Sequence, residues 1–316
     1  MKYLHIRRGN LFFIRIVSEF RLETEAVMNQ INAFVEAKPA QGSVPFPGLL
    51  TRPYLIQFTN YAAHIELEID KGDYIIKTAQ TLDELDKVFH LRHTVFIEEL
   101  IGRKNLFSVD IDRFDKNCDH LIVIEKATGR CVGTYRLISD VYSDEFYSAA
   151  EFHLGRFPEL DGIKLEIGRA CIDSDYRKNN MMGLLWEGIY TYIGKIQARY
   201  IFGCSSVFTN DRTAIASLYL YLQDNNHVRN DLDIRPRKKY AIPTLRDDLA
   251  AARTWGNDYI ERTAKQVLPR LLKDYFVFGA SVAGEPAYDK AFKCADIFTI
   301  LDLKNLNHTY REERTR

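Results

Sequence analysis

The amino-acid sequence predicts an α/β (α+β) fold with a mixed, mostly antiparallel central sheet and helices on both of its faces. Three observations predict it: apolar residues at helical spacing after residue 81, a run of short apolar strands between residues 120 and 169, and alternating helices and strands from there to residue 302. The composition, with 46% hydrophobic and 27% charged residues, is typical of a soluble globular protein. A chain of 316 residues can bury a sizeable core without disulfides or metals.

The first 36 residues are expected to be helical. The apolar segment from Leu11 to Val17 contains Arg15 and is not followed by a small-residue cleavage site, which favours an amphipathic helix over a signal peptide. Such a helix would pack on the main domain or, alternatively, lie at a membrane interface. The prolines and glycines between residues 39 and 53 predict a linker. No stretch approaches the roughly 18 apolar residues of a membrane span.

The central part of the chain begins with a strand over residues 74–77. Thr81 and Glu84 then have the spacing of a capping box, which predicts the start of a helix that continues through Phe96. Three strands follow, with a turn at residues 128–129 between the first and the second. They are predicted over residues 120–125, 131–138 and 164–169.

The later part alternates between the two element types. Its predicted elements are a helix over 181–198, a strand over 200–204, helices over 213–222 and 259–272, and strands over 275–280 and 296–302. Residues 237–254 are polar and receive no assignment. The expected organisation is an N-terminal helical extension and linker (1–73), a core domain (74–236) and a C-terminal extension that completes the sheet (237–316).

Charge and cysteine content narrow the class of protein. The formal net charge is +0, so no global field attracts nucleic acid or an anionic membrane. The five cysteines are scattered without CxxC spacing, which favours reduced thiols in a cytoplasmic protein; peripheral membrane contact is the alternative location. His90 and His93 lack the i, i+4 spacing of a helical metal pair, and no metal is assigned.

Four clusters of polar and aromatic residues stand out against this background. One lies on the first core helix, one in an acidic run, one at the end of a strand, and one on the strand that leads to residue 177. They contain Arg92 and Phe96; Asp110, Asp112 and Asp115; Gly133 to Leu137 with Arg136; and Leu165 to Arg169 with Glu166.

The order and spacing of these clusters resemble the ornithine N-acyltransferases, a group that also carries the name hemolysin, and more distantly the acyl-homoserine-lactone synthases. The resemblance covers roughly residues 76 to 310. Arg-x-x-x-Phe, two acids three apart, Arg-Leu and Glu-x-x-Arg occur in the synthases in this order. The runs that resemble the ornithine enzymes are Gly168-Arg169-Ala170-Cys171, Leu184-Leu185-Trp186 and Phe202-Gly203-Cys204-Ser205-Ser206.

The resemblance implies a GNAT fold and an N-acyltransferase that moves a fatty acyl group from a thioester to the amine of an ornithine-like amino acid. It implies Glu166 as general base, with Asp115 as second candidate. Backbone amides near residues 167–169 would stabilise the thioester oxyanion. The substrate-binding residues that it implies are Arg92, Phe96, Asp112, Arg136 and Arg169.

The turn before residue 181 departs from the glycine-rich turn with which most GNAT enzymes hold the coenzyme A pyrophosphate. Asn180 and Met182 occupy its glycine positions, and their side chains obstruct close backbone approach. The helix N-terminus still offers free amides to a single phosphate. We therefore expect the phosphopantetheine of an acyl carrier protein as the donor, with no tightly bound cofactor. Arg177, Lys178 and Gly183 are the expected phosphate-binding residues.

Each assignment has a structural alternative. Arg92 could be a solvated or ion-paired helix residue, and Asp112 and Asp115 could cap a turn. Glu166 and Arg169 could form a structural ion pair, although residues three apart on a strand point to opposite sides unless a bulge intervenes. For the whole chain the alternatives are a lactone-type signal synthase and a non-catalytic acyl-binding or membrane-associated module.

Overall fold

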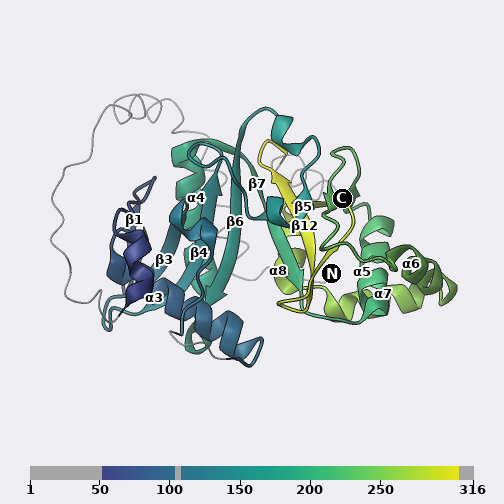
Figure 1. Cartoon of the computed structure of the whole chain (residues 1–316), viewed down its shortest axis with the longest axis horizontal. Helices are drawn as coiled ribbons and strands as arrows, with labels where there is room; N and C mark the ends of the chain where they lie inside the picture. The colour runs from purple at the N-terminus through teal and green to yellow at the C-terminus, as the bar shows by residue number, and fades with distance from the viewer. Residues whose placement is uncertain (1–51, 104–107, 306–316) are drawn as a thin grey trace, which may run out of the picture. The chain divides into compact units, whose positions relative to one another are not determined.

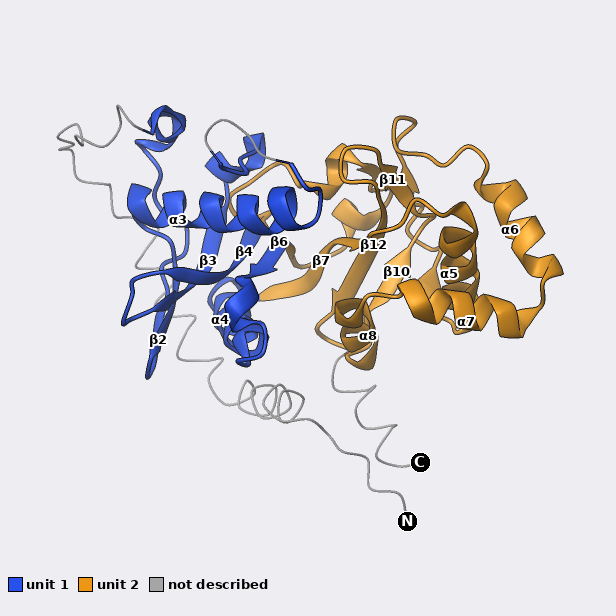
Figure 2. Ribbon diagram, turned by 90° about the horizontal axis from the view of Figure 1, so that it is seen from below, with its two compact units in different colours: residues 1–137, 169–197 blue, residues 138–168, 198–316 orange. Residues whose placement is uncertain are grey.

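The computed structural model describes residues 52–103 and 108–305 (Figure 1). The helical extension and most of the linker expected before residue 52 lie outside these residues. Cα packing divides the chain into two compact units, each built from two segments (Figure 2). Unit 1 comprises residues 1–137 and 169–197, and unit 2 comprises 138–168 and 198–316. This division differs from the three consecutive segments expected from the sequence, which stay a prediction.

Unit 1 holds a sheet in the order β1-β2-β3-β4-β6. Its first four strands follow one another in the sequence, and each of them pairs antiparallel with the next. Their bounds are β1 Glu68–Lys71, β2 Tyr74–Thr78, β3 Asp119–Glu125, β4 Cys131–Ser139 and β6 Ile163–Ile172. The end of β4 (138–139) and the first part of β6 (163–168) belong to unit 2.

Two helices cover opposite faces of this sheet (Figure 2). The helix α3 (Leu82–Arg92) packs on the face that carries Ile122, and α4 (Met181–Ile196) packs on the face of Leu121, where Gly188 lies directly against that leucine. The predicted capping box is confirmed: Thr81 accepts from the amide of Glu84, whose side chain returns to the amide of Thr81. The next segment, His93–Glu99, is a π-helix.

Unit 2 holds a sheet in the order β6-β7-β12-β10-β8, with β11 against β12. The strands β6 and β7 are parallel, as are β8 and β10, while β12 pairs antiparallel with β7, β10 and β11. The bounds are β7 Ala198–Val207, β8 Val228–Arg229, β10 Ser281–Ala283, β11 Ala287–Asp289 and β12 Cys294–Asp302. A separate pair joins β5 (Phe152–His153) to β9 (Arg235–Pro236).

The two faces of the unit 2 sheet carry different cores. On one face, helices α5 (Arg212–Asp224), α7 (Asn257–Val267) and α8 (Arg270–Val277) pack on residues such as Val207 and Ile297. The helix α6 (Leu245–Thr254) packs with α5 and α7, in the segment left unassigned from the sequence. On the other face an aromatic cluster is centred on Phe157, Phe202 and Phe298.

Two sequence predictions in this unit are wrong. The helix expected over 259–272 is two helices, because Leu268 precedes Pro269 and takes an extended conformation. The strand expected over 275–280 is the end of α8 instead; Leu272, Tyr275 and Phe276 face the same core. The chain turns at Gly279, with φ of 87°, and the strand begins only at Ser281.

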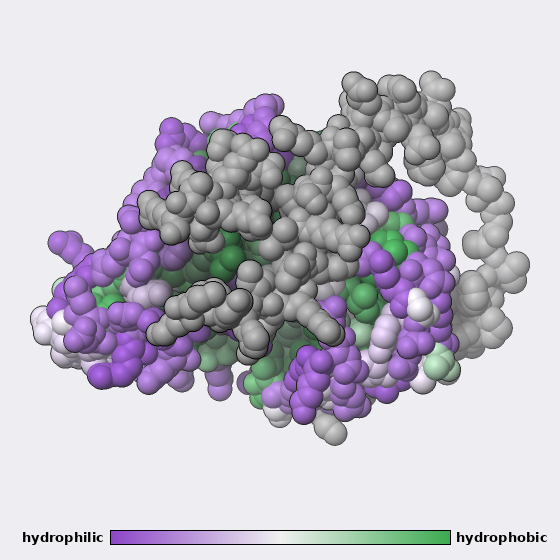
Figure 3. Space-filling model, turned by 180° about the vertical axis from the view of Figure 1, so that it is seen from behind, coloured by the Kyte–Doolittle hydropathy of each residue, from purple (hydrophilic) through white to green (hydrophobic). Residues whose placement is uncertain are grey.

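The fold class is as predicted: mixed α/β, with a mostly antiparallel sheet and helices on both faces. Within the described residues no helix combines the length and apolar character needed to span a bilayer. The face drawn in Figure 3 is mainly hydrophilic where described residues are visible, with smaller hydrophobic patches.

Candidate active site

Six charged residues from four segments of unit 1 form one ionic network, here called the arginine–aspartate network. It begins at Arg92, the last residue of α3, whose side chain is fully buried. Its guanidinium donates to both carboxylate oxygens of Asp115, at 2.7 and 3.2 Å, and its Nε donates to Asp110 at 2.8 Å. The solvated-residue alternative for Arg92 is therefore wrong, and the ion-paired one holds. The six members are Arg92, Asp110, Asp112, Asp115, Arg136 and Arg169.

Arg136 joins the network from β4. Its Nη1 donates to both oxygens of Asp112 at 2.7 Å and to Asp115 at 3.2 Å. Like Arg92, it is buried, so it can stay charged only because carboxylates surround it.

Arg169 joins from β6 and is the most accessible of the three arginines. Its Nη2 donates to Asp112 at 3.1 Å, its Nε lies 3.5 Å from Asp110, and its guanidinium lies 5.9 Å from the ring centre of Phe96. The backbone at Arg169 is left-handed, with φ of 50°. This irregularity within β6 breaks the regular alternation of side chains along the strand.

Asp112 and Asp115 are held in place by the cap of a short 3-10 helix. Asp112 caps Arg113–Lys116 by accepting from the amide of Phe114, and the side chain of Asp115 accepts from the amide of Asp112 at 2.7 Å. The capping alternative is thus realised together with the ionic contacts. The cap thus orients both carboxylates toward the arginines that they bind.

The network keeps the side chain of Asp115 in its ionised, carboxylate form. Burial alone would raise the pKa of this carboxyl, but attraction to Arg92 and Arg136 outweighs burial and holds the pKa well below its usual range. A carboxylate with so low a pKa is a weak general base. These contacts favour a role for Asp115 in holding the two arginines.

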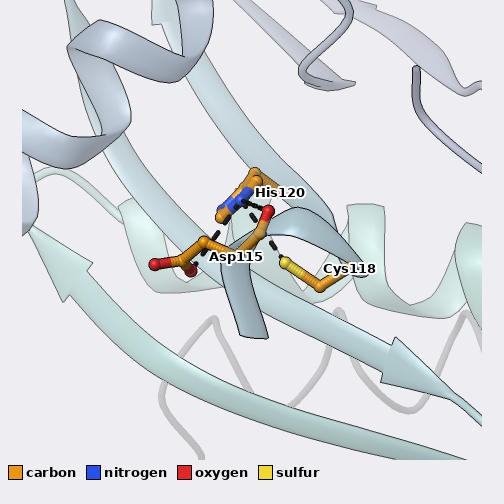
Figure 4. Close-up of side chains that lie close together, drawn as sticks. All are labelled: Asp115, Cys118 and His120. Carbon is orange, nitrogen blue, oxygen red and sulfur yellow. Dashed lines mark hydrogen bonds and ion pairs between the residues drawn. The ribbon is translucent and has the colours of Figure 1, made fainter. Parts of the chain in front are cut away.

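His120 and Cys118 lie next to the buried side of Asp115 (Figure 4). The Nε2 atom of His120 is 3.4 Å from the Cys118 sulfur and 3.9 Å from Asp115 Oδ1. Burial lowers the pKa of His120 to about 4, so the ring is neutral at pH 7. The three residue types could ligate a metal, but the guanidiniums on Asp115 repel a further cation.

Glu166 lies in unit 2 with a different set of partners. Its buried carboxylate accepts from the amides of Tyr147 and Ser148, at 2.6 and 2.7 Å, and from the Ser148 hydroxyl. Glu166 thus bonds to the turn at residues 147–148, whereas Arg169 bonds to Asp112.

Glu166 also marks the point at which two parallel strands stop pairing. The pairing of β6 with β7 ends at Glu166 and Phe202, whereas β7 continues along β12 as far as Val207. Gly203 follows at once, and a side chain there would meet the carbonyl oxygen of Ile167 at 2.3 Å. At Gly168, by contrast, a side chain would meet no atom within 4 Å. The backbone beyond Ile167 thus has open space beside it.

The expected phosphate-binding residues lie at the start of α4. Arg177 pairs with Glu99 and donates from Nε to the carbonyl of Ile172, while Lys178 is exposed. The amide of Gly183 donates to the carbonyl of Asn180 at 2.9 Å. A side chain at residue 183 would meet the Asn180 amide group at 2.8 Å, so the asparagine side chain stands over the first turn of the helix.

Sequence reasoning assigned no role to Asp110, although it singled out the acidic run that contains it. It also missed Ser148 and the buried acids Glu151 and Asp289. These residues are far apart in the sequence, and no spacing signal links them to Glu166.

Comparison with known proteins agrees with the expected resemblance. Residues 91–187 match the family described as acetyltransferase (GNAT) domain. The L-ornithine N(alpha)-acyltransferase of Brucella abortus (strain 2308) is 30% identical over 257 residues, which cover 76% of this chain and 88% of the relative. That of Rhizobium meliloti (strain 1021) is 30% identical over 254 residues, covering 74% and 81%.

A solved structure with a similar fold is that of a coenzyme A-dependent acyl-homoserine lactone synthase. The identity is 14%, the TM-score is 0.40, and the match covers 73% of this chain and 82% of that chain. A similarity of this size carries no information about substrate or donor.

Proposed function

Because the chain belongs to the L-ornithine N(alpha)-acyltransferase family, we propose that it transfers a fatty acyl group from an acyl carrier protein thioester to the α-amine of ornithine or a close analogue. The amine nitrogen attacks the thioester carbonyl carbon; the C–N bond forms, the C–S bond breaks, and the amine proton ends on the carrier thiol. The products are an acyl-amino acid and the free carrier.

One observation carries the proposal: six charged residues from separate segments converge in the arginine–aspartate network, and all of them lie within the part of the chain that matches the acetyltransferase family. A buried network with three arginines and three aspartates is balanced in formal charge. It can therefore hold guanidiniums rigidly without excess charge of either sign.

Arg169 is the proposed ligand of the substrate carboxylate. Arg92 and Arg136 are buried and engaged with Asp115, whereas the side chain of Arg169 is 15% exposed and sits at the edge of the network. A guanidinium fixed by Asp112 can still present donors to a carboxylate. Phe96, beside the same guanidinium, would contact the apolar part of the substrate.

Glu166 remains the first candidate for the general base. Its place at the end of β6–β7 pairing puts it next to the open backbone at Gly168, which is where a thioester carbonyl would meet backbone amides. Its three hydrogen bonds to residues 147–148 support the alternative role of anchoring that turn. The two roles predict different effects of substitution.

The test is direct. Purified protein is incubated with palmitoyl-acyl carrier protein and an equal mixture of ornithine and S-adenosylmethionine, and the products are identified by mass spectrometry with fragmentation to locate the acyl group. We expect Nα-palmitoyl-ornithine. Formation of an acyl lactone from S-adenosylmethionine, with no acyl-ornithine, would return the chain to the signal-synthase alternative.

A further inference from the structure

A second group of acids lies in unit 2, apart from the arginine–aspartate network. Glu151 follows a short turn, Asp289 ends β11, and Asp296 lies on β12; all three side chains are buried. One carboxylate oxygen from each lies within 4.8 Å of the other two. Within residues 52–103 and 108–305, no lysine, arginine or histidine forms an ion pair with any of them.

Most of the donors around this acidic triad are neutral. The hydroxyl of Ser206 donates to Asp296 at 2.5 Å, and the Cys294 thiol is 3.7 Å from the other oxygen of Asp296. Asp289 accepts from the backbone amides of Ala291 and Phe292. These contacts hold the carboxylates in position but supply no positive charge.

One oxygen of the triad accepts no hydrogen bond from a donor among the described residues, although the side chains of Glu151 and Asp296 are hydrogen-bonded to each other. Oε2 of Glu151 is completely buried and accepts no hydrogen bond, although Glu151 is only 1% exposed. A buried acceptor without a donor costs free energy, and a buried cluster of acids needs either protons or a cation. This oxygen therefore points to a missing donor inside the triad.

The spacing of the triad fits an ammonium group. Three acceptors that each receive a hydrogen bond of about 2.8 Å from one tetrahedral –NH₃⁺ lie roughly 4.6 Å apart. The three oxygens of Glu151, Asp289 and Asp296 all lie within 4.8 Å of one another, so one ammonium can reach all of them. An ammonium offers three donors and no acceptor, so it suits the triad once the buried acids have released the protons that they otherwise hold.

The triad is also connected, through Ser148, to Glu166, which is the proposed general base. Ser148 donates from its amide and hydroxyl to Glu166, and its carbonyl accepts from the amide of Glu151 at 3.1 Å. Cys204 on β7 lies within electrostatic range of Glu151, Asp296 and Glu166 together. Ser148 and Cys204 thus connect Glu166 with the triad.

Resting on the proposed function, we propose that Glu151, Asp289 and Asp296 bind the side-chain ammonium of the acceptor and make the enzyme specific for diamino acids. The α-amine reacts, while the distal ammonium is held in the triad and donates to the unpartnered oxygen of Glu151. Monoamino acids of the same length leave the buried carboxylates without a cation and bind poorly.

The experiment compares ornithine with norvaline, which has the same carbon chain without the distal amine. In the wild-type protein, kcat/KM should be at least about a hundredfold higher for ornithine, since a site built for a polar group rejects an analogue without it. Asp296→Asn keeps an acceptor for Ser206 and should lower kcat/KM for ornithine about tenfold or more. The same change should alter the norvaline value by less than about twofold.

A control variant, a second triad variant and a binding measurement make the result specific. Asp302→Asn, on the same strand but paired with Arg199, should leave the ornithine-to-norvaline ratio unchanged. Glu151→Gln tests the triad if the Asp296 variant does not fold. Calorimetric binding of ornithine and norvaline to the wild-type protein reports on the ammonium site without turnover.

The outcomes separate this inference from the proposed function. Acylation of ornithine and norvaline with equal efficiency, or an equal loss for both in Asp296→Asn, would overturn the ammonium site and leave the acyltransferase standing. Stabilisation of the wild-type protein by Mg²⁺ or Mn²⁺, lost in Glu151→Gln, would make the triad a metal site instead. Preferential calorimetric binding of ornithine without any acylation would support the ammonium site and defeat the proposed reaction.

Discussion

Arg92 and Asp115 form a two-pronged ion pair in which both side chains are almost entirely removed from solvent. Asp115 also contacts Arg136 and caps its own turn, so one carboxylate fixes two buried guanidiniums and a loop. Removing its charge would leave both arginines buried beside a neutral group. The cost of breaking a buried pair in this way is about 3–5 kcal/mol.

Asp115→Asn should therefore lower the free energy of unfolding by roughly that amount, measured by urea denaturation. The matched control is Asp83→Asn, because Asp83 pairs with Lys87 on the surface, where such pairs contribute about 0–1 kcal/mol. A folded Asp115→Asn protein of normal stability whose only defect is turnover would restore Asp115 as a catalytic acid or base.

Arg169→Lys should raise the KM for the amino acid about tenfold with a smaller change in kcat. A lysine ammonium cannot contact Asp112 and a substrate carboxylate with the planar geometry of a guanidinium. Steady-state kinetics with ornithine measure the effect. Arg130→Lys, in an exposed pair with Asp173, is the control. An unchanged KM accompanied by a lower melting temperature would limit Arg169 to a structural role.

The substitution Glu166→Gln distinguishes a role of Glu166 as general base from a role in anchoring residues 147–148. As a base, its loss should reduce kcat by about 10²-fold or more, since general-base catalysis typically contributes about 10²–10⁴. Ser148→Ala removes the hydroxyl bond but keeps the carboxylate, so it should lower the melting temperature with little loss of kcat. If both variants lose stability and activity in parallel, Glu166 serves only to hold residues 147–148.

Stability should depend on pH through the acidic triad. Burial, together with repulsion from Asp296, raises the pKa of Glu151 to about 8, and burial raises the pKa of Asp296 to about 6. The groups that face them are Asp289, the Tyr147 and Ser206 hydroxyls and the Cys294 thiol. The unfolded chain releases both protons near pH 4, whereas the folded protein keeps them to about pH 6 and 8.

The direction in which stability changes with pH follows from the number of protons bound in the folded and unfolded states. Between these pH values the folded state binds more protons than the unfolded state, so the free energy of unfolding falls as pH rises. Glu151→Gln removes the titrating group and should flatten the decline between pH 5 and about 9, measured by denaturant titration at each pH. Identical pH profiles for the wild-type and variant proteins would contradict the assignment.

The donor prediction concerns the start of α4. Asn180 stands over the first turn of the helix, and Arg177 and exposed Lys178 lie just before it. We expect higher kcat/KM with palmitoyl-acyl carrier protein than with palmitoyl-coenzyme A. Raising the ionic strength should slow only the carrier reaction, because screening weakens the attraction between basic residues and an acidic carrier. Equal or better efficiency with the coenzyme A thioester would reverse the donor assignment.

Local signals in the sequence were enough to predict most of the fold. The Thr81 capping box, the strand positions in unit 1 and the helix at residue 181 are confirmed because each depends on nearby residues. The prediction failed around Pro269, where apolar residues suit a helix and a strand equally and only the tertiary core decides.

The candidate site was predicted in part for the same reason. The spacing of the acids around Phe114 is a local pattern, and the resemblance supplied Arg136 and Arg169. Glu151 and Asp296 lie close together in the fold although more than a hundred residues separate them in the sequence, and each alone looks like an ordinary acid. No periodicity or short motif in the sequence predicts that these two residues lie close together.

The way the chain crosses between its two units has a consequence for protein engineering. It passes from one unit to the other after Leu137, after Gly168 and after Gln197, and the first two crossings fall inside β4 and β6. Neither unit is a contiguous stretch of sequence, so no simple truncation isolates one of them with its sheet complete. A chimera that exchanges one unit with a relative must transplant two separate segments and rejoin both interrupted strands in register.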